Sequence, residues 1–375
     1  MKFRYIFSVV LLLIFSCQKE ELQEGDSATV DFSVRVAGVR VETRSTLIDY
    51  DADTFDYPFG VYGYCVPYKV LDNSTLDYQN AVGEWNSKRF YTGPDVFNGF
   101  MPVNYIGGKC TSTYQGAENS KSLVTEGSSA SRYTYTFFSY YPHIASSPVW
   151  SSSVQNLKSF NTPTFTFTMP ISNQNGVVND SAIPDAMVAE TYDHLRSDGA
   201  VPLKFRHILT AVNVEIVNYD NRDINLTSLQ LDGTAFYKTL IVDFSGQDKV
   251  DSPATTYDGS FSLLNQNASD NLVKSGQSKL MRTILVLTNP ANNQIASSLK
   301  LLGNYTIGVA QSDGTIVNGL TDGINIPINS LKTKAGYIYT LTLDFVNGAF
   351  TLSLGSEEMW DNGDQSESSN NSTII

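Results

Sequence analysis

Apolar and polar residues alternate along most of this chain, and this alternation limits what it can fold into more than any other feature. In the stretch ATVDFSVRV the apolar residues fall on every second position, at Val30, Phe32, Val34 and Val36. Successive side chains of a β-strand point to opposite faces, so this pattern predicts a strand with one buried face.

The same pattern recurs in six further stretches, each ending near Gly, Pro, Asn or Ser: RYTYTFFSYYP, TFTFTMP, TAVNVEIVNY, RTILVLT, YIYTLTLDF and GAFTLSL. No segment sustains an apolar stripe at helical spacing. The one plausible helical turn lies at Pro184–Thr191. We therefore predict an all-β protein, built most simply as β-sandwiches.

The length of the chain favours two domains, because about 360 residues remain beyond the N-terminal apolar segment. A polar connector, TYDHLRSDGAVP, separates two series of predicted strands. We place an N-terminal β-sandwich domain at 28–200 and a C-terminal one at 201–360. The polar, Ser- and Asn-rich tail at 361–375 is predicted to be disordered.

The chain begins with a basic segment, an apolar run and a cysteine. Lys2 and Arg4 precede the apolar stretch 5–15, which is of the length typical of a secretory signal and too short to span a membrane. The following residues, IFSC, resemble a bacterial lipobox ending at Cys17. We predict a signal peptide at 1–16 and a lipidated spacer at 17–27, anchored to the outer membrane through Cys17. The alternative is an ordinary signal peptide cut elsewhere.

The overall charge of the chain is negative. It has 25 Lys and Arg against 38 Asp and Glu, a net charge of −13. This balance argues against nucleic acid as a partner and against a basic patch that binds a membrane surface.

Two further cysteines, Cys65 and Cys110, allow a disulfide in an exported protein. Cys65 sits in FGVYGYCVPY, an apolar stretch that resembles a strand, so a buried free thiol is an equal alternative.

No residue pattern indicates catalysis, a metal site or a cofactor. The histidines, His143, His194 and His207, have no metal-binding spacing. Arg206 and His207 are neighbours on a predicted strand and should point to opposite faces. The acidic stretch at 49–53 starts like a calcium loop but lacks its glycine and its glutamate. We expect no enzyme activity.

Several short motifs occur in one order along the chain: the lipobox, DFSVRV, VETRST, FGVYGY, FFSYYP, PDAMVAE, PLKFRHILTAVNVEI, LKTKAGYIYTLTLDF and MWDNG. Together they resemble the fimbrillin family, the subunits of type V pili of Gram-negative anaerobes. The resemblance implies two tandem transthyretin-like (Greek-key) β-sandwich domains and a structural or adhesive role.

The resemblance also implies how such a subunit matures. Fimbrillins are exported as lipoproteins and are then cut by a trypsin-like protease after an arginine downstream of the first strand. Arg44 in VETRST matches that position, although Arg35 and Arg40 also suit such a protease. Cleavage would remove the strand 28–36 and open a groove for a donor strand from a neighbouring subunit. The alternative is that Arg44 is an ordinary exposed loop residue.

Beyond Trp360 the chain offers only Ile374 and Ile375 as apolar residues, too few for a donor strand. This resembles a tip or accessory subunit, on the cell surface and then in the fimbrium, with host or bacterial surface ligands as further partners. The alternative is a glycan-binding surface lipoprotein that never polymerises and uses Trp85 or Trp150 as a sugar platform.

Overall fold

The computed structural model describes residues 32–36, 54–68, 70–71, 75–76, 101–112, 132–143, 164–174, 177–179, 183, 185–194, 198–244, 251–264, 268–310, 316–329 and 331–359. Apart from the short 3-10 helix η3 (Ala268–Asn271) and a single 3-10 residue, Asp198, the regular structure of these residues is β-strand. This confirms the all-β class.

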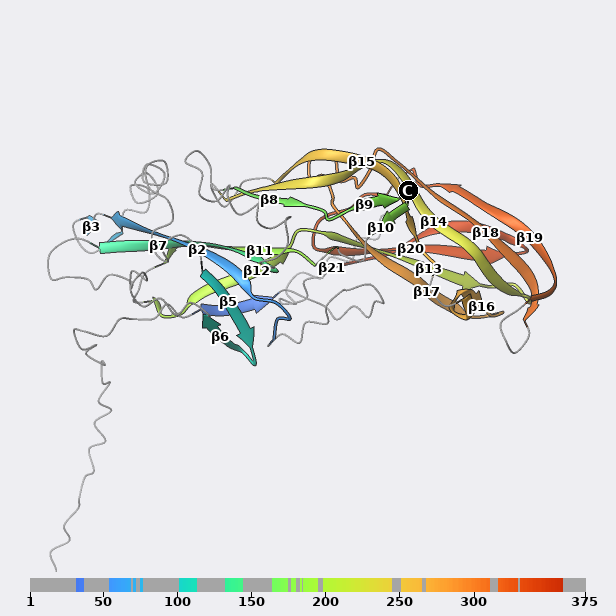
Figure 1. The fold of residues 1–375 in the computed structure, drawn as a ribbon, viewed down its shortest axis with the longest axis horizontal. Coiled ribbons are helices and arrows are strands. Elements are labelled where there is room, and N and C mark those ends of the chain that lie inside the picture. The colour runs from blue at the N-terminus through green and yellow to red at the C-terminus, as the bar shows by residue number, and fades with distance from the viewer. Residues whose placement is uncertain are drawn as a thin grey trace, which may run out of the picture.

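A seven-stranded sheet occupies one end of the molecule (Figure 1). In spatial order its strands are β1 (Phe32–Val36), β12 (Val201–His207), β11 (Met187–His194), β7 (Arg132–Tyr141), β2 (Phe59–Tyr68), β5 (Met101–Ile106) and β6 (Lys109–Ser112). A separate two-stranded ribbon consists of β3 (Val70–Leu71) and β4 (Thr75–Leu76).

Two further sheets form the other end (Figure 1). The eight-stranded sheet contains β19 (Ile316–Pro327), β18 (Ser298–Ala310), β14 (Asp223–Asp243), β15 (Ser252–Ser262), β10 (Val177–Asn179) and β9 (Ser172–Gln174), with β16 (Leu272–Val273) and β8 (Thr164–Thr168) paired to β14. The four-stranded sheet contains β17 (Ser278–Val286), β13 (Thr210–Asn218), β20 (Tyr337–Val346) and β21 (Ala349–Met359).

Three clusters of buried apolar side chains fill the spaces between and within these sheets. The distal core lies between the eight-stranded and four-stranded sheets and includes Leu231, Phe261 and Leu341. The middle core lies between the seven-stranded sheet and strands β8, β13 and β14. The enclosed core lies on the opposite face of the seven-stranded sheet, and its side chains come from that sheet and from the residue Phe55.

Strand β14 belongs to two of these cores. Its first part pairs with β18 and contributes Leu226 and Leu229 to the distal core, and its last part pairs with β8 and contributes Leu240 and Val242 to the middle core. Between the two parts Ala235 has a positive φ of 53°. The pairing of β14 with β15 shifts its register at the same place.

The strands predicted from alternation are confirmed, because each of the seven stretches contains an observed strand. The helical turn predicted at Pro184–Thr191 is wrong, since Met187–His194 forms β11. Met187 and Ala189 are buried in the enclosed core while Ala186 and Val188 are buried in the middle core. A strand buried on both faces shows no alternation of apolar and polar residues.

The predicted domain boundary between 200 and 201 falls between β11 and β12, which are paired neighbours in one sheet. Strands β8, β9 and β10 precede this boundary in sequence but belong to the eight-stranded sheet with β14 and β15. The division into tandem domains therefore stays a prediction.

Gly303 on β18 leaves no space for a side chain. A Cβ atom there would lie 2.5 Å from the backbone oxygen of Ser228. Gly303→Ala is expected to lower the free energy of unfolding by about 1–3 kcal/mol, because the backbone must move to relieve the overlap. Gly323→Ala on the adjacent β19 is the control, since its nearest contact would be an ordinary 3.8 Å. Equal urea-denaturation midpoints for the two variants would contradict this packing.

Candidate functional site: the first strand and its groove

The first described strand, β1, forms one edge of the seven-stranded sheet and pairs with β12 alone. The pairing is parallel, with Phe32 opposite Val201 and Val36 opposite Phe205, whereas the other pairs of strands described in this sheet are antiparallel. Strand β1 also lies near β6, the opposite edge, so the sheet curves around the enclosed core. Strand β1 therefore lies between β12, with which it pairs, and β6.

The side chains of β1 alternate between this core and solvent, as predicted. Phe32 and Val34 are 6% and 9% exposed, while Ser33 and Arg35 are exposed. For Val36 only the backbone pairing is described, and Val30 lies outside the described residues. The strand thus inserts two apolar side chains into the core and leaves polar ones on the outer face.

Aromatic rings surround the buried end of Phe32. Its ring contacts those of Phe59 and Phe137 edge-on, with centroids 6.2 and 5.8 Å away. Phe59 in turn contacts Phe205 at 5.3 Å and Phe55 at 6.1 Å. Such edge-to-face contacts add to the free energy gained by burying the rings. The rings of Phe59 and Phe137 thus wall the place of one aromatic side chain, which we call the Phe32 pocket.

Phe55 was not predicted from the sequence as part of the site. Its backbone N–H donates to the carbonyl oxygen of Tyr105 at 2.8 Å, which fixes the segment before β2 over the enclosed core. Its ring lies 5.6 Å from that of Phe205 and 4.7 Å from that of Tyr141. The only hint in the sequence is an isolated phenylalanine in the polar stretch DADTFDYP.

The position of β1 at an edge has a direct physical consequence. If β1 left, backbone N–H and C=O groups of β12 would lose their partners, and the rings of Phe59 and Phe137 would lose their contact with Phe32. An exposed edge with an apolar floor is a template for another extended strand. The arrangement can therefore bind one strand with alternating apolar residues.

The outer face of the same two strands carries charge. Arg35 of β1 lies directly opposite Lys204 of β12, and both side chains are exposed. Arg206, two residues further along β12, donates to Asp251 at 2.9 and 3.4 Å and lies 4.0 Å from Glu190. Burial raises the pKa of Glu190, and the nearby Arg206 partly opposes that rise.

The predicted separation of Arg206 and His207 is confirmed. Arg206 binds Asp251 on the outer face of the sheet, whereas His207 Nδ1 lies 2.9 Å from Asp185 Oδ1 in a buried pair. His194 and His143 have structural partners too, the carbonyl oxygen of Gly199 and the hydroxyl of Tyr140. Burial lowers the pKa of His143.

No metal-binding arrangement occurs in the described part of the chain. Its His, Cys, Asp and Glu side chains do not form a group of three that could hold an ion.

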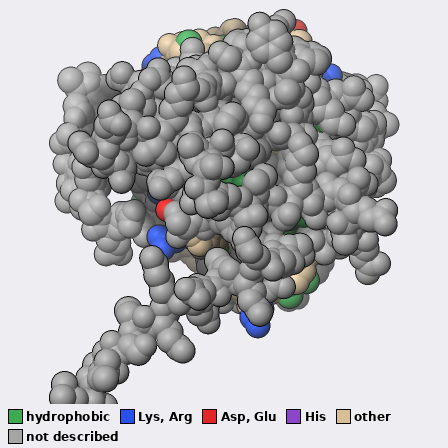
Figure 2. Space-filling model, turned by 90° about the vertical axis from the view of Figure 1, so that its left-hand side faces the viewer, with side chains coloured by type: hydrophobic (Ala, Val, Ile, Leu, Met, Phe, Trp, Pro, Cys, Tyr) green, Lys and Arg blue, Asp and Glu red, His purple; other side chains and the backbone are tan. Residues whose placement is uncertain are grey.

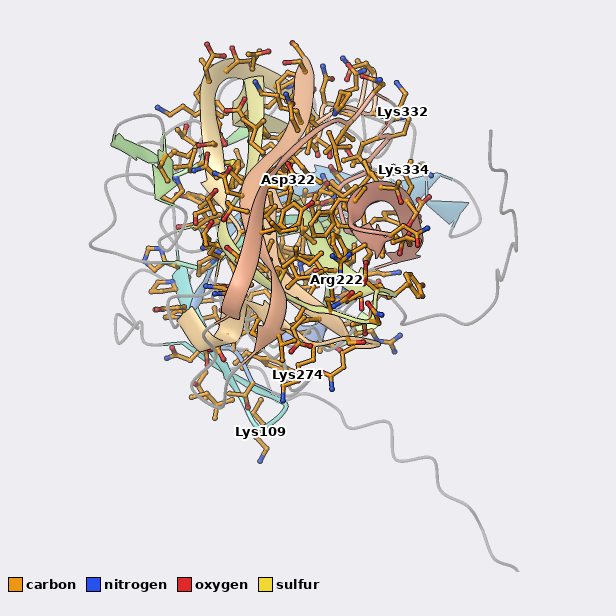
Figure 3. All side chains as sticks on the ribbon, turned by 90° about the vertical axis from the view of Figure 1, so that its right-hand side faces the viewer. Lys109, Arg222, Lys274, Asp322, Lys332 and Lys334 are labelled. Carbon is orange, nitrogen blue, oxygen red and sulfur yellow. The ribbon has the colours of Figure 1, made fainter. Side chains whose placement is uncertain are left out.

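The basic side chains do not gather at one place either. Figure 3 shows the labelled side chains Lys274, Lys332 and Lys334 spread over one end of the molecule without converging on a common point. On the opposite end, Figure 2 shows the basic side chains of the described surface scattered singly.

The strand register does not bring Cys65 and Cys110 together. Cys110 pairs with Tyr105, two positions beyond Val103, and Val103 is opposite Phe59. Cys65 lies on β2 in the other direction from Phe59. The two positions are therefore roughly 26 Å apart along the strands, compared with the limit of about 7 Å between Cα atoms in a disulfide.

Other residues singled out in the sequence lie outside the described residues. They are the lipidation site Cys17, the cleavage site Arg44, the acidic stretch 49–53 and the tryptophans Trp85, Trp150 and Trp360. Within the described residues no helix is long and apolar enough to cross a membrane.

The described chain is all-β, and its edge strand β1 packs on an apolar core. The model of the Fimbrillin-like family matches residues 111–359, more than half of the chain. This protein belongs to the fimbrillin-like family. No curated protein matches the chain significantly.

Solved structures similar to this chain include three fimbrial proteins. One, from Bacteroides vulgatus ATCC 8482, has a TM-score of 0.56 and 19% identity and covers 88% of this chain and 100% of its own. Another is a fimbrial assembly protein from Parabacteroides distasonis ATCC 8503, with a TM-score of 0.37, 9% identity and coverage of 87% and 98%.

The third is the tip fimbrial protein Mfa3 from Porphyromonas gingivalis with a C-terminal truncation, with a TM-score of 0.36, 11% identity and coverage of 88% and 100%. The Bacteroides vulgatus protein shares the fold of this chain. The matched family is one of fimbrillin-like proteins.

Proposed function

We propose that this protein is a structural or adhesive subunit of a type V pilus, assembled at the cell surface by replacement of its first strand. The observation that carries the proposal is β1 itself, an edge strand whose Phe32 and Val34 complete the enclosed core. Membership of the fimbrillin-like family supports a pilus subunit or adhesin.

In this proposal Cys17 carries the lipid that anchors the exported chain to the outer membrane. A trypsin-like protease then cuts after Arg44, and the segment that contains both Cys17 and β1 leaves. A strand from a neighbouring subunit takes the place of β1 and supplies both backbone hydrogen bonds to β12 and side chains for the enclosed core.

Strand β21 packs against the core of its own subunit, so it is poorly suited to be donated to a neighbouring one. This favours a subunit that accepts a strand. Phe350 of β21 packs on Tyr305 and Phe345, with ring centroids 4.9 and 4.8 Å away. Leu352 packs against the distal core. Releasing β21 would expose that core, so we propose a tip or accessory position in the pilus.

Arg44→Ala is expected to abolish the cut that leaves Ser45 as the N-terminus, because a trypsin-like protease requires Arg or Lys before the bond it cuts. N-terminal sequencing of protein released from the cell surface should give Ser45 for the unaltered chain. The variant should give no Ser45 N-terminus and enter fewer SDS-stable polymers.

Arg40→Ala is the matched control, since Arg40 is the next basic residue upstream of Arg44. It should mature normally. A surface protein that keeps Cys17 in the unaltered chain and never enters polymers would contradict the proposal and favour a permanently anchored lipoprotein.

A further inference from the structure

We propose that the groove occupied by β1 selects its incoming strand by side-chain size and by charge. The preferred strand carries an aromatic residue opposite Val201, a branched apolar residue opposite Leu203 and an acidic residue opposite Lys204. This inference rests on the proposed replacement of β1 and specifies the chemistry of the partner strand.

The first element of selection is size. The Phe32 pocket is walled by rings that meet Phe32 edge-on, so a smaller side chain at this position would leave a cavity between Phe59 and Phe137. Val34 is the next buried position, opposite Leu203. β-Branched residues suit such half-buried strand positions. The spacing of the two positions fixes the register of any incoming strand.

The second element is charge, and here β1 itself fits poorly. Arg35 and Lys204 lie directly opposite each other on neighbouring strands, and both are exposed on the same face. Like charges in this position destabilise a strand pair. Neither cation forms a salt bridge within the described part of the chain. Asp251 binds the neighbouring cation of β12, Arg206, through both carboxylate oxygens.

The direction of exchange follows from this pairing. A strand with an acidic residue opposite Lys204 replaces a repulsive pair by an attractive one and keeps the apolar contacts unchanged. Strand β1 is thus held by its apolar side chains and disfavoured by its charge. The groove can in this way prefer a partner strand over the strand that it first carries.

Fluorescent peptides with the sequence of Ala28–Val36 test the proposal on the full chain after cleavage at Arg44. Binding is measured by anisotropy at low salt for the native peptide and its variants. The Arg35→Glu peptide should bind roughly 2- to 30-fold more tightly than the native peptide. The Phe32→Ala peptide should bind at least about 50-fold more weakly, as expected for removal of a buried ring.

Two controls isolate the pairing with Lys204. The Ser33→Glu peptide introduces an acid on the same exposed face but opposite Pro202, and its affinity should change less than that of Arg35→Glu. In a chain with Lys204→Ala, and also at high salt, the preference for the Arg35→Glu peptide should disappear.

The outcomes separate the two proposals. If the cleaved chain binds none of the peptides, the replacement of β1 is overturned and this inference falls with it. If it binds the native peptide but shows no preference for Arg35→Glu, or keeps that preference with Lys204→Ala, selection by charge is overturned while strand replacement stands. Equal binding of native and Phe32→Ala peptides would overturn selection by size.

Discussion

Replacing Phe59 by alanine is expected to lower the free energy of unfolding by about 3–5 kcal/mol. The Phe59 side chain is fully buried at the centre of the enclosed core, where its ring contacts those of Phe32, Phe55 and Phe205. Alanine would leave a cavity that the surrounding strands cannot close, because they are paired on both sides. Urea denaturation followed by circular dichroism measures the loss.

Ile106→Ala is the matched control for this variant. Ile106 lies on β5, the strand that pairs with β2 next to Phe59, but its side chain is 62% exposed. An exposed substitution of this kind usually changes stability by less than about 0.5 kcal/mol. If both variants unfolded at the same urea concentration, Phe59 could not be the centre of a core that forms around β1.

The Phe59 variant also bears on strand binding. The ring of Phe59 forms one wall of the Phe32 pocket, so its removal should weaken the hold on β1 as well as the fold around it. The native β1 peptide should therefore bind the cleaved Phe59→Ala chain more weakly than the cleaved Ile106→Ala chain. The same aromatic cluster stabilises the subunit and receives its partner.

Local alternation was enough to predict β1, β7, β8, β13, β17, β20 and β21, but not β14, the longest strand. Alternation identifies a strand wherever one face is buried and the other is wet, as in β20, where Leu341 and Leu343 are buried and Thr342 between them is less so. It fails at β11, because Met187 and Val188 are buried on opposite faces. The spacing of the apolar residues in that short run fits a helical turn equally well.

Pairing between distant strands could not be predicted in the same way. The sequence indicated that β1 is a strand with an apolar face, but not that it runs parallel to β12, far along the chain. Likewise, β8 and β10 precede the polar connector and yet pair with β14 and β15. Register depends on tertiary contacts, and so the pairing of Arg35 with Lys204 emerges only from the structure.

Replacing Asp185 by alanine is expected to lower the free energy of unfolding by about 2–4 kcal/mol. Asp185 Oδ1 and His207 Nδ1 lie 2.9 Å apart, and both side chains are only 1% exposed. Without the carboxylate, the imidazole loses a buried hydrogen-bond partner that water cannot easily replace. Urea denaturation at neutral pH measures the change.

The pair joins β11 and β12, the two strands that follow β1 in the order of the sheet. Asp185 lies just before β11, and His207 is the last residue of β12, where Met187 and His207 are opposite each other. The backbone N–H of Ile208 donates to the carbonyl oxygen of Ala186 at the same place. Loss of Asp185 should therefore loosen the end of β12, and hydrogen exchange of the β12 amides should rise with the loss of stability.

Asp232→Ala separates this buried pair from an ordinary ion pair. Asp232 lies 3.3 Å from Lys300 at the surface, with its side chain 32% exposed. Exposed pairs contribute at most about 1 kcal/mol, so this variant should stay close to the unaltered chain. If Asp185→Ala were equally mild, the contact with His207 would not hold β11 and β12 together, and the edge that receives β1 would owe its order to apolar packing and backbone pairing alone.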